Sequence, residues 1–117
     1  MIVRRLAEQA PFTTKDGSTI RSLLDRSNAP VEKQSLAEAS LSPEGATERH
    51  YHRLSEEFYF ILEGEGTMEI DGETRDVAPG DAILIPPGAW HQIRAKTALR
   101  LLCCCAPPYD HGDTYFD

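Results

Sequence analysis

Turn-forming residues recur along the whole chain and leave only short runs between them. The runs are apolar or alternate between apolar and polar residues, which is typical of short strands joined by tight connections. Turns are expected at residues 15–17, 27–30, 42–45, 63–66, 71–72, 78–81 and 86–89. The stretch TMEI-DG-ETRDV predicts a hairpin, because Asp71 and Gly72 suit a type I′ turn in which both central residues need positive φ.

Eight or nine short strands without a clear helical period favour a closed or sandwiched antiparallel β structure. One segment conflicts with this pattern: residues 33–41, KQSLAEASL, favour helix by propensity. We assign a strand there because turn residues bound the segment. We also expect a buried strand at 82–85 (AILI), and we expect the Pro-led polar tail to lie across the surface.

Length and charge limit the possible functions. The chain has 117 residues, enough for one domain, and its 19 acidic and 12 basic residues give a formal charge of −7. Such a surface repels phosphate backbones, so nucleic-acid binding is not expected. No stretch is apolar enough for a signal peptide or a membrane span, and we expect a soluble, cytoplasmic protein.

The three cysteines, Cys103, Cys104 and Cys105, are consecutive and lie in the apolar run LRLLCCCA. Neighbouring cysteines cannot form a disulfide framework, and free thiols suit a reducing compartment. We interpret them as small apolar residues of a buried strand, with a catalytic or metal-binding role as the alternative.

The stretch HYHRLSEEFYFILEG brings two histidines and an acidic pair together. In a strand, residues i and i+2 project from the same face, so His50 and His52 point the same way. His91 follows a later turn at 86–89 and opens another strand. Three imidazoles and one carboxylate can surround a divalent ion such as Mn, Fe, Co, Ni, Cu or Zn. Either Glu56 or Glu57 could supply the carboxylate, since alternation turns only one of them inward.

At these positions the sequence resembles the cupin superfamily. The first cupin motif matches Gly45, His50, His52, Glu57 and Gly64, with four residues between Gly45 and His50, where five is usual. The six-residue spacing to Gly64 favours Glu57 over Glu56 as the carboxylate. The second motif matches Gly80, Pro86, Gly88 and His91, with Ala95 in place of the usual Asn.

The resemblance implies an all-β, antiparallel double-stranded β-helix (jelly-roll) barrel. It would form a single domain over residues 1–117, with an N-terminal arm (about 1–14) and a C-terminal tail (about 106–117). It further implies one divalent transition metal ion per chain, Fe, Mn, Ni or Zn, held by His50, His52, Glu57 and His91. By alternation Phe58, Phe60 and Leu62 face outward and need cover, and we therefore expect a homodimer, as is common among cupins.

A metal with an open coordination position would suit an enzyme that acts on a small oxygenated metabolite. The ion would serve as Lewis acid or oxygen activator, and the reaction would be of isomerase, lyase or dioxygenase type. Two alternatives stay open: a non-catalytic barrel that binds or senses a small ligand, and a closed structural metal site.

Several side chains are candidates for work beside the ion. Tyr59 shares the inward face with Glu57 and is the candidate catalytic residue, although a core tyrosine is the simpler interpretation. Tyr109 and His111 are weaker candidates, because they fall in a tail expected to be exposed. Arg100 could bind an anionic substrate if it faced inward, whereas Trp90 is expected to pack.

Overall fold

A computed structural model describes residues 1–116 of the chain. Within these residues, the helical elements are two short 3-10 helices, η1 (Leu6–Glu8) and η2 (His111–Asp113). The strands are β1 (Phe12–Thr13), β2 (Thr19–Leu24), β3 (Ser35–Leu41), β4 (His50–His52), β5 (Glu56–Glu63), β6 (Gly66–Ile70), β7 (Glu73–Val77), β8 (Ala82–Ile85), β9 (His91–Ala95), β10 (Leu99–Ala106) and β11 (Thr114–Phe116).

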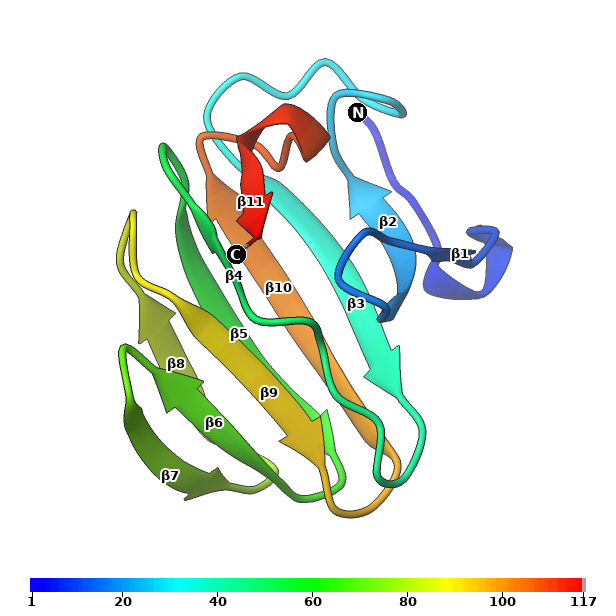
Figure 1. Cartoon of the computed structure of the whole chain (residues 1–117). Helices are drawn as coiled ribbons and strands as arrows, with labels where there is room; N and C mark the ends of the chain where they lie inside the picture. Colours follow the sequence, from blue (N-terminus) through cyan, green and yellow to red (C-terminus); the bar gives the residue numbers. More distant parts are fainter. Residues whose placement is uncertain (117) are drawn as a thin grey trace.

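The strands form two antiparallel sheets that pack against each other (Figure 1). The larger sheet has the order β1-β2-β3-β10-β5-β8, and the smaller has the order β11-β4-β9-β6-β7. The core between them is built from both sheets, with Ile61 and Leu101 from the larger and Ile93 and Met68 from the smaller. The predicted all-β jelly-roll fold is therefore confirmed, and the segment at 33–41 contains the strand β3 rather than a helix.

Strand β5 shows how the sequence pattern decides which side chains enter the barrel. Glu57, Tyr59 and Ile61 are buried, whereas Phe58 and Phe60 are exposed on the opposite face of the same strand. The alternation is the expected consequence of a period of two residues. It carries the carboxylate of Glu57 and the ring of Tyr59 into the space between the sheets.

Two connections depend on backbone conformations that few residues adopt. Asp71 and Gly72 have φ values of 49° and 87°, as the predicted β6–β7 hairpin requires. Gly64 has φ of 84°, and a Cβ at this position would lie only 2.0 Å from the carbonyl oxygen of Ala98. The motif glycine at 64 is thus needed for a close backbone approach, and the predicted turn at 63–66 narrows to residues 64–65.

Three expectations about the elements are wrong. The described residues contain eleven strands rather than eight or nine, and the additional ones are very short. Strand β8 lies at the edge of the larger sheet, so Ala82 and Leu84 are exposed although a buried strand was expected. The C-terminal tail does not merely lie across the surface, because β11 pairs with β4 and Asp113 and Thr114 are buried.

No helix among residues 1–116 combines the length and apolar character that a membrane crossing requires.

Candidate metal centre

Three histidines meet at one end of the barrel interior. His50 and His52 come from β4, and His91 opens β9, which pairs with β4 through His50 and His91. One ring nitrogen from each lies within 4.8 Å of the others, and all three side chains are buried. This brings together the three histidines that the spacing singled out, and they could hold a metal ion.

Each imidazole is oriented by a hydrogen bond at its Nδ1 atom. The acceptors, for His50, His52 and His91 in turn, are the backbone carbonyl oxygens of Glu48 at 2.7 Å, Asp113 at 3.1 Å and Ala89 at 3.0 Å. Because a carbonyl oxygen can only accept, each Nδ1 carries the hydrogen, and the lone pair of a neutral ring is then on Nε2. Such partners fix both tautomer and ring orientation in metal sites.

Glu57 points its carboxylate at the same place. Its Oε1 atom lies 3.4 Å from His52 Nε2 and 3.5 Å from His91 Nε2. Within residues 1–116, Glu57 Oε1 and His91 Nε2 are the buried side-chain atoms that have no hydrogen-bond partner. Two unpartnered polar atoms of this kind carry a desolvation penalty, and an ion bound between them would remove it. The residues present thus fit a divalent metal.

The pKa values of the cluster shift in different directions. Burial alone would raise the pKa of Glu57, but contact with His52 and His91 outweighs this and lowers it to about 2. Burial and the neighbouring His91 lower the pKa of His50, whereas the Glu57 carboxylate outweighs burial and raises that of His52. The ionised carboxylate and the neutral His50 are forms that bind metal, whereas His52 must lose its proton when a metal binds.

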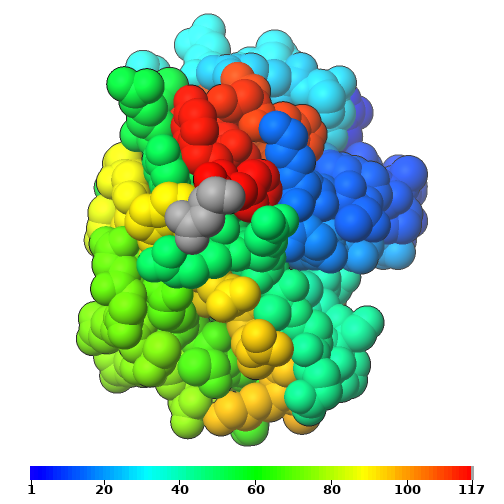
Figure 2. Space-filling model, viewed as in Figure 1, coloured from blue at the N-terminus to red at the C-terminus, as the bar shows by residue number. Residues whose placement is uncertain are grey.

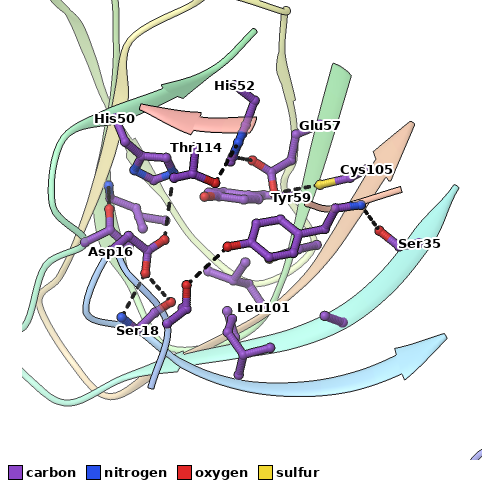
Figure 3. A pocket seen from close by; sticks show the side chains of 18 of the residues that line it. Asp16, Ser18, Ser35, His50, His52, Glu57, Tyr59, Leu101, Cys105 and Thr114 are labelled. Atoms are coloured by element: carbon purple, nitrogen blue, oxygen red, sulfur yellow. Dashed lines mark hydrogen bonds and ion pairs between the residues drawn. The ribbon is translucent and has the colours of Figure 1, made fainter. Parts of the chain in front are cut away.

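Cys105 holds the Glu57 carboxylate through a hydrogen bond. Its Sγ donates a hydrogen bond of 3.3 Å to Glu57 Oε2, the oxygen that faces away from the histidines (Figure 3). Burial raises the pKa of both Cys105 and Cys103, so the two thiols stay protonated at neutral pH. All three cysteines lie in β10 as predicted, but only Cys105 is buried, whereas Cys103 and Cys104 are half-buried.

A cavity of about 60 Å³ adjoins His50 and His52. Glu57 and Tyr59 also line it, together with apolar side chains of β2, β3, β9 and β10. Burial raises the pKa of Tyr59 well above its ordinary value, so its hydroxyl remains protonated. The candidate catalytic tyrosine thus lies at the cavity wall, where its hydroxyl can donate a hydrogen bond.

Asp16 is a cavity residue that the sequence did not reveal. It belongs to the turn at 15–17, and its Oδ2 lies 3.8 Å from His50 Nε2 (Figure 3). Its other oxygen, Oδ1, accepts hydrogen bonds from the backbone N and the hydroxyl of Ser18, at 2.9 and 2.6 Å. An Asp before Gly is ordinary turn chemistry, so nothing in the sequence distinguished this residue from other turn aspartates.

The C-terminal segment also reaches the site. Tyr109 lines the cavity, and its hydroxyl lies 3.4 Å from Thr14 Oγ1 and 3.0 Å from His111 Nδ1. In Figure 2 the C-terminal residues, in red, lie next to the N-terminal ones, in blue, on this face of the molecule. His111 itself is exposed and does not line the cavity. Of the two tail candidates, the structure therefore brings only Tyr109 to the site.

Three other residues that the sequence analysis considered are accounted for by contacts outside the site. Arg100 does not line the cavity and instead forms ion pairs with Glu38 at 2.9 Å and Glu63 at 2.7 Å. Trp90 packs edge-on against Tyr51, with ring centroids 4.6 Å apart, as expected for a packing residue. Ala95, which replaces the usual cupin asparagine, is buried in the hydrophobic core.

Comparison with known families agrees with the fold. The family model described as "Cupin domain" matches residues 37–105, which is more than half of the chain. The chain belongs to the cupin family. Among relatives, an uncharacterised protein of Methanocaldococcus jannaschii is 48% identical over 106 residues, which cover 89% of this cupin and 85% of that protein.

Two further similarities concern proteins with named activities. L-ectoine synthase of Saccharopolyspora erythraea is 32% identical over 114 residues, covering 92% of this cupin and 82% of that enzyme. The structure of the polyketide cyclase RemF from Streptomyces resistomycificus superimposes with a TM-score of 0.79 at 26% identity, covering 91% and 79% of the two chains. Four other relatives are longer, and this cupin spans 52% to 63% of their length.

Proposed function

We propose that this cupin binds one divalent transition metal ion through His50, His52, His91 and Glu57. The observation that carries the proposal is the pair of buried, unpartnered atoms, Glu57 Oε1 and His91 Nε2, which face each other at 3.5 Å. Iron, manganese, nickel and zinc all accept a ligand set of imidazoles and a carboxylate.

We further propose that the metal site is catalytic and acts on a small oxygenated metabolite. Four protein ligands leave one or two positions open on a five- or six-coordinate ion, and a bound ion of this kind supplies Lewis acidity or, if it is iron, activation of dioxygen. The protein's own contribution is to orient the substrate in the cavity and to present the protonated hydroxyl of Tyr59. These features suit an isomerase, lyase or dioxygenase, with Tyr59 as the candidate catalytic residue that donates a hydrogen bond to the substrate.

The relatives support an enzyme without selecting the reaction. One similar protein is named as a synthase of L-ectoine and another as a polyketide cyclase, so related barrels of this family carry out chemistry on small molecules. A second candidate function is a barrel that binds a small ligand without turnover, and the largely apolar walls of the cavity favour it. A closed structural site is less well supported, because a cavity adjoins the histidines.

The free cysteines and the outer face of β5 bear on assembly and location. Cys103, Cys104 and Cys105 are free thiols, which supports a location in the reducing cytoplasm.

Phe58 and Phe60 project from β5 away from the core, which supports a homodimer formed through this face.

The first test is elemental analysis of protein purified without chelators, with and without loading of the metal. We expect about one ion per chain, loss of most of it in His52→Ala and Glu57→Ala, and full retention in His111→Ala, since these variants remove a proposed ligand and an exposed histidine respectively. Circular dichroism should show that all three variants keep the β fold. Full occupancy in a His52→Ala/Glu57→Ala double variant would overturn the ligand assignment.

A further inference from the structure

Strand β3 occupies an interior position in the larger sheet although its sequence is a poor strand former. The segment SLAEASL contains two alanines and a glutamate, which are depleted in strands, and it favours helix by propensity. It nevertheless pairs with β10 on one side and with β2 on the other (Figure 1). Because natural proteins break such local preferences chiefly at functional sites, the inner face of β3 is a candidate for one.

The inner face of β3 carries small side chains that pair with small side chains of β10. Ala37 pairs with Cys103, Ser35 pairs with Cys105, and all four line the cavity. Cys103 in turn pairs with Tyr59 of β5 on its other side. A row of small residues therefore runs across two strands and ends at the candidate catalytic tyrosine. We refer to the space above Ala37 and Cys103 as the inner hollow.

The exposure of these residues shows that side chains of residues 1–116 do not fill the inner hollow. Ala37 and Cys103 are half-buried, although both line the cavity from strands that have a neighbour on each side. Ala39 and Leu101, a pair two positions along the same strands, are only 6% and 2% exposed. Because protein interiors are close-packed, half-exposed side chains on an inner face mark the part of the cavity that a ligand can reach.

The size and chemistry of the cavity limit what can enter the inner hollow. A buried water needs at least roughly 10–15 Å³ of such space, so about 60 Å³ accepts a group of at most about four to six non-hydrogen atoms. Apart from Ser35, the side chains that β3 and β10 contribute to the wall are aliphatic or thiol groups. An aliphatic group suits such a wall, since each methylene removed from water strengthens binding about fourfold.

The inner hollow lies within reach of the proposed metal site. Tyr59 and Glu57 are two residues apart on β5, which is about 6.5–7 Å along a strand. Their partners on β10 are Cys103 and Cys105, which line the same cavity. A molecule whose oxygens lie at the metal site can therefore place a group attached to the oxygen-bearing carbon in the hollow.

We propose that the inner hollow is a binding subsite for a compact aliphatic group of the ligand, and that Ala37 limits the size of that group. The ligand class is thus a small oxygenated molecule in which the oxygen-bearing carbon is attached directly to such a group. The inference rests on the proposed function only for the position of the ligand's oxygens, because Ala37 and Cys103 are not proposed metal ligands.

Hydroxamates are suitable probes, because their two neighbouring oxygens bind divalent metals and the group on the carbonyl carbon can be varied. We expect pivalohydroxamate, which carries a tert-butyl group, to bind metal-loaded protein about tenfold or more tightly than acetohydroxamate, which carries a methyl group, as measured by calorimetry. Xenon is the second probe, since it binds in apolar cavities and needs no metal. It should bind both metal-loaded and chelator-treated protein, as measured by xenon NMR.

Ala37→Val tests the role assigned to Ala37. Valine adds two methyl groups in the hollow, and we expect the preference for pivalohydroxamate over acetohydroxamate and the affinity for xenon each to fall by about tenfold. The thermal midpoint of the metal-free protein should stay at or above that of wild type, because valine favours strands and would occupy open space rather than overpack a filled core. Cys103→Leu enters the hollow from β10 and should have the same effects on binding.

Ser40→Val is the matched control. It introduces the same side chain on the opposite face of β3, at a residue that does not line the cavity. It should leave the affinities for both hydroxamates and for xenon unchanged.

The outcomes distinguish this inference from the proposed function. Equal affinities for the two hydroxamates, absence of xenon binding, or an unchanged preference in Ala37→Val would overturn the subsite and leave the metal site standing. A lower thermal midpoint in both Ala37→Val and Cys103→Leu would also overturn it, since overpacking would show that these positions belong to a filled core. A protein that loads no metal but binds xenon, and binds it more weakly in Ala37→Val, would overturn the metal site and leave the subsite standing.

Discussion

Glu57 divides its two carboxylate oxygens between a thiol and a pair of imidazoles. Oε2 accepts from Cys105 Sγ, and Oε1 faces the Nε2 atoms of His52 and His91. Because the side chain is buried, its ionised form depends on these partners for its stability. The unfolding free energy of the metal-free protein should therefore depend on whether the Glu57 carboxyl group is ionised.

The pKa of Glu57 predicts a dependence of stability on acid. Its folded pKa of about 2 lies below the ordinary value of 4.5, so its contribution is fully present above about pH 4.5 and is lost as the pH falls toward 2. A shift of this size corresponds to on the order of 3 kcal/mol. We expect the difference in unfolding free energy between wild type and Glu57→Gln to shrink by that order over this window, measured by urea denaturation of metal-free protein.

Glu56→Gln is the matched control for this experiment. Glu56 precedes Glu57 on β5 and is exposed on the opposite face, so its replacement should change the acid dependence little. Equal acid curves for wild type and Glu57→Gln would contradict the electrostatic role assigned to Glu57.

Some residues of the candidate site could be predicted from the sequence, and others could not. Strand alternation allows only one of Glu56 and Glu57 inside, and the motif spacing to Gly64 favours Glu57; the structure has Glu57 buried and Glu56 exposed. Asp16 could not be found in this way, because its position beside His50 depends on how a turn packs against a strand far along the chain. Local patterns predict the face on which a side chain lies, but they do not predict such long-range neighbours.

The segment of η2 and β11 supports the site without contributing a proposed ligand. The buried carboxylate of Asp113 accepts hydrogen bonds from the backbone N–H groups of Arg53, Leu54 and Ser55, at 3.0 to 3.1 Å. These residues connect His52 to β5, and the backbone oxygen of Asp113 also accepts from His52 Nδ1. The tail therefore fixes the connection that brings His52 and Glu57 together.

Asp113→Asn should loosen this connection. Asparagine has one acceptor oxygen where the carboxylate has two, so at least one buried N–H group loses its partner, at a cost of about 1–3 kcal/mol. We expect a lower thermal midpoint and metal affinity reduced by about tenfold or more, since partners that orient metal-bound histidines have effects of this size. Differential scanning calorimetry and competition with a chelator measure the two quantities.

Asp110→Asn provides the control in the same segment. Asp110 is exposed and caps η2 by accepting from Gly112 N at 2.8 Å, and asparagine is an equally good capping residue. Metal affinity in Asp113→Asn as high as in Asp110→Asn would show that the tail does not position the site.

A strand could be predicted from the sequence when the pattern that determines it lies within a few residues, but not when it depends on distant partners. Strand β5 and the hairpin of β6 and β7 carry their pattern within a few residues, as alternation in one case and a type I′ turn in the other. Strand β11 carries no such pattern, because its partners are β4 and a connection some sixty residues earlier in the chain. A polar, Pro-led tail that is buried through hydrogen bonds is not distinguishable in sequence from one that remains on the surface.

At the scale of the whole molecule, the outer face of the larger sheet is unusually apolar for a surface. The exposed fractions of Phe58, Phe60 and Leu84 are 51%, 43% and 54%. Phe58 pairs with Leu84 of β8 and with Cys104 of β10, so the apolar side chains continue across three neighbouring strands. Contiguous apolar patches are typical of surfaces that bind another protein, and the proposed homodimer would cover this one with a second copy.

We expect wild-type protein to elute as a dimer in size-exclusion chromatography with light scattering, and Phe58→Asp to weaken the dimer by about 100-fold or more, because a charge would replace a central aromatic side chain. Val3→Asp is the control: Val3 is an exposed apolar residue near the N-terminus and lies outside the larger sheet. It should leave the dimer intact.

The fold of each variant is checked by its metal content, because the metal site lies on the inner face and does not depend on the patch. A monomeric wild type, or a dimer that persists in Phe58→Asp/Phe60→Asp, would show that this face is not where two copies meet.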